Sequence, residues 1–333
     1  MKFLTDSVNG AIDLNSTSRS RLYFIMKNQS LLFGLACVGL LALPVQAGSG
    51  ASAKGSVESG KEVVAIHPVA PDCSDRQIQP LFSRYAQTTK KWTIRGSYRS
   101  FTDMELQEVD EFDGSSYDFE LTAPLGERWQ LRFYYPLHTE GDASEIGSGD
   151  DVDIEGDGGM LDFPSLTVDW QFKQAGASDE WNMAAYFGLG TVREYLDSEN
   201  QVTGGNDRIN HRGSVALFGL KADKQLSHCW TFIGNLGGRY YWDSDDIHPN
   251  GGSDVFYLMD ASAAFVYAPE NAWAYPMIEF VYQGSFSDYN SLQVVPQVIV
   301  PIGEHLDINA GVSLGVLDDG PSTDARVQMT LRF

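Results

Sequence analysis

The last ten residues of the chain constrain its fold more than any other stretch. Asp324 to Phe333 reads D-A-R-V-Q-M-T-L-R-F, in which apolar and polar residues alternate strictly. Alternation with a period of two places the apolar residues on one face of a β-strand and the polar residues on the other. This pattern predicts a strand that has one face in an apolar medium and one face in water, and that runs to the final residue.

The same alternation recurs from Trp92 onward, in stretches of about ten residues separated by turns. One face of nearly every stretch carries large aromatic and aliphatic residues, and the other carries Arg, Asp, Gln and Thr. The registers of the fifth, sixth and ninth stretches stay open, and Gly188, Gly190 and Gly219 are interpreted as bends. We predict twelve strands, at 91–101, 116–125, 129–139, 163–173, 181–193, 212–224, 229–242, 254–267, 273–286, 291–302, 306–316 and 324–333.

A closing strand that ends on an aromatic residue resembles the C-terminal strand of bacterial outer-membrane β-barrel proteins. In that family the terminal aromatic, here Phe333, belongs to the signal read by the barrel assembly machinery. The even strand number, with alternating short and long connections, is typical of the same family. The resemblance covers residues 92–333. It implies an all-β fold, a 12-stranded antiparallel transmembrane β-barrel with a short N-terminal periplasmic extension, integral in the bacterial outer membrane with both termini periplasmic.

A soluble, secreted β-sandwich or lipocalin-like barrel would also produce alternation and turns. It would not place the large apolar residues on the outer face of a barrel, because a water-soluble barrel buries them inside. Tryptophan placement supports the membrane interpretation, since its ring prefers the membrane interface. One end of the predicted strands holds Trp92, Trp129, Trp170, Trp181, Trp230 and Trp273, and the other end holds Trp242.

The N-terminal part of the chain has the features of an exported protein. Residues 26–47 are interpreted as a signal peptide, with Met26-Lys27, an apolar run and a small-residue cleavage site ending at Ala47. Residues 1–25 are interpreted as an over-called start or a leader. Residues 48–90 are predicted to be a flexible linker and a periplasmic segment, with a short helix after Ser74 that is interrupted at Pro80. The barrel follows at 91–333.

The charge of the chain excludes one class of partner. Cleavage after Ala47 removes four basic and two acidic residues, which takes the formal net charge from −22 to −24. So acidic a chain repels nucleic acid. No stretch after the signal approaches the roughly 18 continuous apolar residues of a transmembrane helix, so only a closed barrel would allow the chain to cross a membrane.

The inner face of the predicted barrel mixes charges of both signs. We expect the lumen to be lined by Arg95, Arg99, Asp118, Glu120, Arg132, Asp169, Arg239, Asp260, Glu279, Asp307, Arg326 and Arg332. The predicted loops 102–115 and 140–162 are acidic and contain no Lys or Arg. The leading hypothesis is therefore passive passage of small solutes with a preference for cations. The alternative is a non-conducting structural or surface barrel whose acidic extracellular loops bind divalent cations, lipopolysaccharide or a partner.

Two candidate sites lie outside the lumen. The acidic residues Asp151, Asp153, Glu155, Asp157 and Asp162 have the spacing of a calcium-binding loop, although strands rather than helices flank them, so Ca²⁺ is a candidate ligand of residues 150–162. Cys73 and Cys229 remain after export, and a disulfide between them or two separate thiols are both open. The six histidines have no metal-ligand spacing, and we expect no enzymatic activity and no other cofactor. The expected partners are outer-membrane lipid, lipopolysaccharide, the barrel assembly machinery and small solutes.

Overall fold

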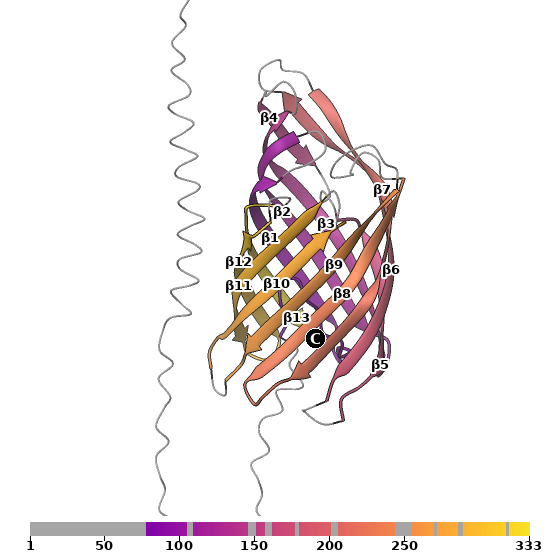
Figure 1. Cartoon of the computed structure of the whole chain (residues 1–333), viewed down its shortest axis with the longest axis vertical. Coiled ribbons are helices and arrows are strands. Elements are labelled where there is room, and N and C mark those ends of the chain that lie inside the picture. Colours follow the sequence, from indigo (N-terminus) through magenta and orange to yellow (C-terminus); the bar gives the residue numbers. More distant parts are fainter. Residues whose placement is uncertain are drawn as a thin grey trace, which may run out of the picture.

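The structure, a computed structural model, describes residues 78–104, 109–145, 151–156, 162–176, 180–200, 206–243, 255–269, 272–285, 289–317 and 320–333. Within these ranges the chain forms one antiparallel sheet of thirteen strands (Figure 1). The strands are β1 (Thr93–Met104), β2 (Val109–Pro124), β3 (Trp129–Glu145), β4 (Asp151–Gly156), β5 (Ser165–Lys173), β6 (Asn182–Asn200), β7 (Asn206–Gln225), β8 (Trp230–Trp242), β9 (Val255–Tyr267), β10 (Tyr275–Gly284), β11 (Asn290–Ile302), β12 (Leu306–Gly315) and β13 (Thr323–Arg332). No helix long and apolar enough to cross a membrane is present in the part of the chain that the structure describes.

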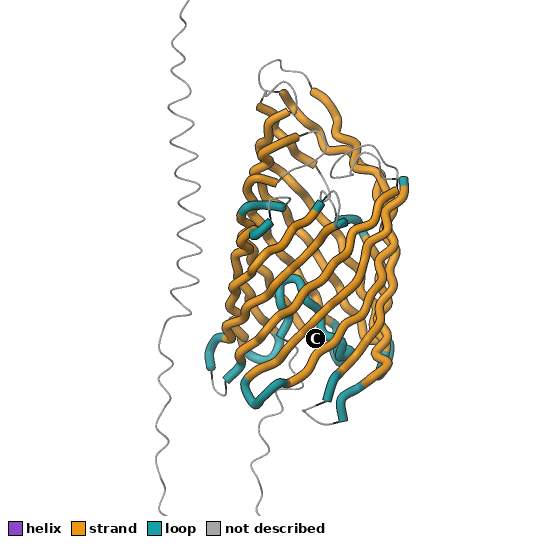
Figure 2. The backbone as a smooth tube through the Cα atoms, viewed as in Figure 1, coloured by secondary structure: helices purple, strands orange, loops and turns teal. Residues whose placement is uncertain are grey.

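Twelve of these strands close into a barrel. Strand β1 pairs with β13, which joins the two ends of the sheet. Strand β3 pairs with β5, and β5 with β6, so the ring continues without β4. Strand β4 instead pairs with β3 and β6 beyond the end of β5, and it extends the barrel wall on that side (Figures 1 and 2). The predicted 12-stranded antiparallel all-β barrel is confirmed.

The predicted loops 102–115 and 140–162 are largely strand, which corrects the sequence analysis. Strand β2 begins at Val109 and β3 continues to Glu145. Strand β4 follows β3 along the chain and precedes β5. The pairing of β1 with β2 shifts register near Asp103, a non-glycine residue with a φ of 53°. A bulge of this kind breaks the period of two that the sequence analysis relied on. A small apolar core holds the extension together, formed by Phe101, Met104, Phe112, Ala143 and Ile154.

The outer surface of the barrel is apolar and aromatic. Exposed side chains include Phe187 and Phe218, which face each other across β6 and β7 and so fix the two registers that the sequence left open. Trp129 stacks on Trp170 with ring centroids 5.8 Å apart at the end of the barrel that carries the short turns. Trp273 lies in the turn before β10, so the ninth predicted strand, whose register was left open, begins at Tyr275 rather than at residue 273. So large an exposed apolar surface fits contact with lipid rather than water.

Gly219 has a packing role that the sequence interpretation did not include. It lies opposite Gly237 in a continuous pairing of β7 with β8. The ring of Tyr186 on the neighbouring strand β6 lies against both glycines on the inner wall, and a Cβ atom at either position would collide with it. The glycines therefore make room for a tyrosine inside the lumen.

Candidate functional site in the barrel lumen

Residues 78–91, here called the lumen segment, run inside the barrel as far as Thr89 and reach the exposed rim at Lys90 and Lys91 (Figure 2). They contain no helix, so the helical prediction fails for this part, and the preceding residues are outside the described ranges. The segment runs around the inner wall and contacts ten of the barrel strands. Its polar partners are Gln328, Asn309, Gln297, Glu279, Ser262, Asn235, Asp223, Gln171, Gln130 and Glu120, from β13 round to β2.

The side chains of the wall serve as hydrogen-bond acceptors for the backbone of the lumen segment. A backbone outside any sheet ladder still needs partners when it is buried, and here amide and carboxylate oxygens supply them. The N–H of Leu81 donates to Gln297 at 3.1 Å, that of Ala86 to Asp223 at 2.7 Å, and that of Thr89 to Gln130 at 2.9 Å. The segment is therefore fixed in place at many points, and it narrows the lumen at its level.

Glu279 is the most deeply buried of these acceptors, with no exposed surface. It accepts hydrogen bonds from the N–H groups of Phe82 and Ser83, and from the Gln297 side chain at 2.8 Å. A carboxylate without water needs several such donors to remain buried. Glu279 faces the lumen as expected, and its carboxylate is bound to the lumen segment.

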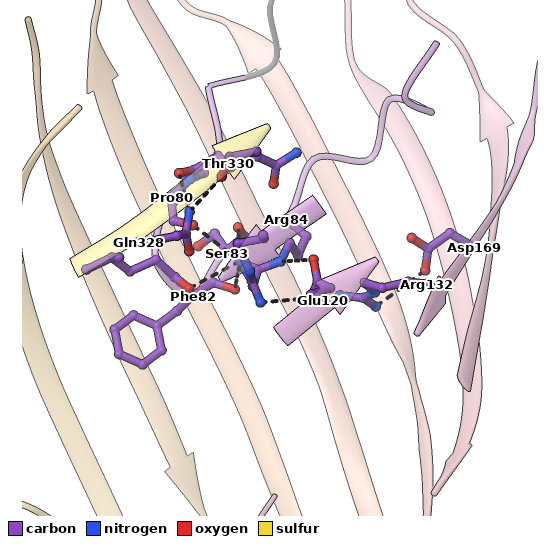
Figure 3. A network of polar contacts seen from close by, with 12 residues as sticks. Pro80, Phe82, Ser83, Arg84, Glu120, Arg132, Asp169, Gln328 and Thr330 are labelled. Carbon is purple, nitrogen blue, oxygen red and sulfur yellow. Dashed lines mark hydrogen bonds and ion pairs between the residues drawn. The ribbon is translucent and has the colours of Figure 1, made fainter. Parts of the chain in front are cut away.

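Arg84 fixes the shape of the lumen segment itself. Its Nη1 atom donates to the carbonyl oxygens of the four preceding residues, at 2.9 Å for Phe82 and 3.0 Å for Ser83 (Figure 3). Its Nε atom lies 3.6 Å from Glu120 on β2. The guanidinium thus closes a turn in the segment and connects that turn to the wall.

Three carboxylates of the inner wall each pair with two cations. Asp324 contacts Arg99 and Arg326, each at 2.9 Å. Glu120 contacts Arg95 at 2.8 Å in addition to Arg84. The third group joins Asp169 to Lys221 at 2.6 Å and to Arg132 at 3.6 Å. In each group the positive charges outnumber the negative charge.

In the other ion pairs of the inner wall described here, the positive charges do not outnumber the negative charges. Arg239 pairs with Asp260 at 2.8 Å and with Asp162, from the connection before β5, at 2.9 Å. Burial acts to raise the pKa of Asp162, but the guanidinium groups of Arg239 and Arg99 more than offset this, so that pKa lies below its usual value. Arg332 pairs with Asp307 near the short-turn end.

All twelve residues predicted to line the lumen lie on the inner wall, and most of them are joined into the groups above. Three charged residues that were not among the predicted lumen residues also face inward, namely Lys221, Asp223 and Asp324. Lys221 and Asp223 belong to β7, whose register was open, and Asp324 is the first residue of the last predicted strand. Lys221 follows the apolar Leu220, and Asp324 precedes the apolar Ala325. This alternation was the sequence signal that could have identified them as inward-facing.

A cavity of about 310 Å³ lies between the lumen segment and the long-loop end of the barrel. Leu81, Phe82 and Arg84 of the segment form one boundary. Five further arginines of the wall reach it, namely Arg95, Arg99, Arg132, Arg239 and Arg326. The carboxylates that line it are Asp118, Glu120 and Asp162, whereas Asp324 and Asp169 lie behind the arginines that they contact.

The acidic residues of the calcium-like spacing do not converge. Asp151, Asp153 and Glu155 lie in β4, where the residues between them, Val152 and Ile154, are buried. Asp157 is outside the described ranges, and Asp162 contacts Arg239. Within the described residues no group of three or more His, Cys, Asp or Glu side chains is placed to hold a metal ion. The acids of β4 have the alternation of a strand, and Ca²⁺ binding by residues 150–162 stays a prediction.

The two other candidate positions lie at the short-turn end. Cys229, in the turn between β7 and β8, has no disulfide partner within the described part of the chain. Cys73 is outside that part, so their pairing stays a prediction. Phe333 follows β13 with its side chain exposed, and its N–H donates to the carbonyl oxygen of Trp92 at 3.0 Å, where the barrel closes.

A closed barrel with an apolar outer face, tryptophans at its rim and a charged, water-accessible lumen defines the class of bacterial outer-membrane β-barrels. Three solved structures share the fold. The first is an outer membrane channel from Pseudomonas putida F1, at 13% identity over 77% of this chain and 100% of that chain, with a TM-score of 0.52. The transport unit of the autotransporter AIDA-I from Escherichia coli matches at 11% identity over 77% and 93%, with a TM-score of 0.51. The translocator domain of the autotransporter NalP from Neisseria meningitidis matches at 14% over 74% and 90%, with a TM-score of 0.50.

No protein-family model matches the sequence. No curated protein matches it either. At these identities the structural matches show the fold alone.

Proposed function

We propose that this protein allows passive passage of small solutes across the bacterial outer membrane, through a lumen that residues 78–91 narrow. The observation that supports this best is the cavity of about 310 Å³ inside the barrel, lined by charged side chains and bounded by the lumen segment. A barrel of twelve strands lies between the filled barrels of about eight strands and the open ones of about sixteen. Passage would therefore be restricted to small molecules.

In this proposal the short-turn end, with both the lumen segment and Phe333, faces the periplasm. The aromatic outer face contacts lipid, and the long-loop end contacts lipopolysaccharide. Phe333 is the residue that the barrel assembly machinery would read. The protein has no catalytic role and no nucleic-acid partner, and a Ca²⁺ ion bound by residues 150–162 belongs to the alternative below.

The charge preference depends on which part of the path controls entry. The cation preference expected from the sequence rests on the acidic loops at the mouth. The cavity beneath is lined by six arginines, whereas only three of the six carboxylates that accompany them line it, so it presents guanidinium groups more than carboxylates. The narrow part of a pore controls selectivity more strongly than a wide mouth. We therefore propose a preference for anions, with the cation preference as the competing outcome.

The alternative function is a non-conducting surface barrel. The many hydrogen bonds of the lumen segment favour it, because a segment that never leaves the lumen would close the path. The acidic residues at the long-loop end, such as Asp151 and Asp153, would then bind divalent cations, lipopolysaccharide or a partner.

The experiment is to refold residues 48–333 and to record single-channel current in a planar bilayer with a salt gradient. We expect discrete current steps and a reversal potential with the sign of anion selectivity. A reversal potential of the opposite sign would assign selectivity to the acidic loops. A correctly folded barrel that gives no steps would contradict passage and favour the surface role.

A further inference from the structure

We propose that the cavity above the lumen segment is a binding site for a small organic monoanion, with a carboxylate head on the arginines of β1 and β13 and an apolar body against β7 and β8. This site rests on the proposed channel function, because its ligand would reach the cavity through the lumen. Small organic monoanions are then the class of solute that the narrowed barrel selects.

The first observation concerns two arginines that face each other across neighbouring strands, a placement that repulsion between like charges disfavours. Arg99 of β1 and Arg326 of β13 lie directly opposite each other on the inner face. Like charges in this position repel each other and destabilise a sheet. Both form an ion pair with Asp324, which is fully buried behind them, and both also act on the carboxylate of Asp162. The two guanidinium groups therefore face the cavity with more positive charge than Asp324 neutralises.

The second observation is a set of buried donors without acceptors. The side chain of Arg95 is 8% exposed and reaches the same cavity. Its Nη2 atom donates to Glu120, but its Nε and Nη1 atoms have no hydrogen-bond partner within the described residues. Buried N–H groups that lack an acceptor cost free energy, and a turn of the Arg95 side chain toward a ligand oxygen in the cavity would remove that cost.

The charge of this wall specifies a monoanion. Arg84, Arg95, Arg99 and Arg326 reach the cavity from the lumen segment, β1 and β13, and Glu120, Asp324 and Asp118 oppose them. Asp162 also acts on Arg99 and Arg326, although it is shared with Arg239. The charges of the wall therefore nearly balance, and a ligand with a single negative charge fits better than one with several. A guanidinium matches the geometry of a carboxylate better than any other side chain does.

The opposite wall is apolar. Strands β7 and β8 lie halfway round the barrel from β1 and β13. They contribute Val215, Leu217 and Tyr241, which cluster with Phe163. Arg239 on this side is already paired with two carboxylates, so it offers no surplus positive charge. A ligand that spans the cavity thus meets positive charge at one end and an apolar surface at the other.

The test uses three probes that share one ring and differ in charge, namely benzoate, benzamide and benzylamine. Equilibrium dialysis of the refolded mature barrel in detergent, at low salt, measures their binding without any current. We expect benzoate to bind about tenfold or more tightly than benzamide, and benzylamine not to bind, because charge-assisted hydrogen bonds are worth at least this factor.

The variant Arg99→Gln should lower benzoate affinity about tenfold while the barrel still folds, since Asp324 keeps its hydrogen bonds from Arg326. Arg95→Gln is a second variant with the same expected loss. The matched control is Arg128→Gln, because Arg128 is exposed in the turn between β2 and β3 and should leave affinity unchanged. Equal binding of benzoate and benzamide, or unchanged affinity in folded Arg99→Gln, would overturn the site.

Current recordings on the same preparation separate this proposal from the channel function. A barrel that conducts but binds no benzoate contradicts only the anion site. A barrel that binds benzoate with the expected dependence on Arg99 but gives no current supports the site and contradicts passage.

Discussion

A truncated chain that begins at Lys90 is expected to conduct severalfold more current per open channel than one that begins at Ile78. The two chains differ only in the lumen segment, and both contain the whole barrel from Thr93 onward. Removal of the segment takes Leu81, Phe82 and Arg84 away from the cavity and leaves the polar side chains of the wall to water. Without the lumen segment, the lumen of the twelve-stranded barrel is expected to carry more current, as the open lumens of wider barrels do. Planar-bilayer recordings measure the difference.

Both chains must fold for this comparison to be informative. Circular dichroism and the resistance of the folded barrel to dodecyl sulfate before heating provide the check. Equal conductance of the two folded chains would show that the lumen segment does not determine the width of the conducting path. It would remove the main structural support for a narrow path.

Replacement of Asp169 by Asn is expected to lower the free energy of unfolding by about 3–5 kcal/mol, because it leaves buried cations without their counter-charge. Asp169 binds Lys221 at 2.6 Å and lies 3.6 Å from Arg132, and the side chains of Asp169 and Lys221 are 4% and 2% exposed. Urea unfolding in lipid, followed by tryptophan fluorescence, measures the loss. A second change, Lys221→Met, should restore part of it, because the surplus cation is then removed.

The matched control for this variant is Asp243→Asn. Asp243 pairs with Arg212 at 3.8 Å, and the two side chains are 52% and 41% exposed. Exposed ion pairs contribute less than about 1 kcal/mol, so the control should unfold almost as the parent does. If both variants lose the same free energy, the ion pairs inside the lumen are no more important than those at the surface.

The barrel was predictable from the sequence because lipid imposes a strict rule on one face of each strand. Strand β12, for example, alternates Leu306, Ile308 and Ala310 with polar residues, and the structure pairs it with β11 and β13 in the expected positions. Strand β4 lies beyond the membrane-spanning wall. Its alternation, with Val152 and Ile154 buried, was interpreted as the spacing of a calcium-binding loop because the acids between them also recur every second residue.

The lumen segment left no comparable signal. Its backbone binds side chains that lie far away in the chain, such as Gln297, which is 216 residues from Leu81. Hydrogen bonds to a backbone place no demand on the residue type of the segment, so neither period nor composition records them. The inward charges were predictable from alternation. Which carboxylate would face two cations depends on which strands and segments meet in the closed barrel. Arg99 and Arg326 are 227 positions apart in the sequence and meet only when the barrel closes.

The most direct test of this account asks whether the lumen segment lies inside the barrel in the membrane. Ser83 of the segment and Ser262 of β9 have their hydroxyl oxygens 2.8 Å apart. Cysteines at these positions, in a chain whose Cys73 and Cys229 are replaced by serine, are within the reach of a disulfide. Mass spectrometry of the membrane-inserted barrel after mild oxidation should show a loss of two hydrogens in Ser83→Cys/Ser262→Cys. The control Ser83→Cys/Ala263→Cys, with the second cysteine on the outer face, should keep both thiols. Two free thiols in the first variant would contradict the placement of the segment, and with it the narrowed lumen on which the proposed function depends.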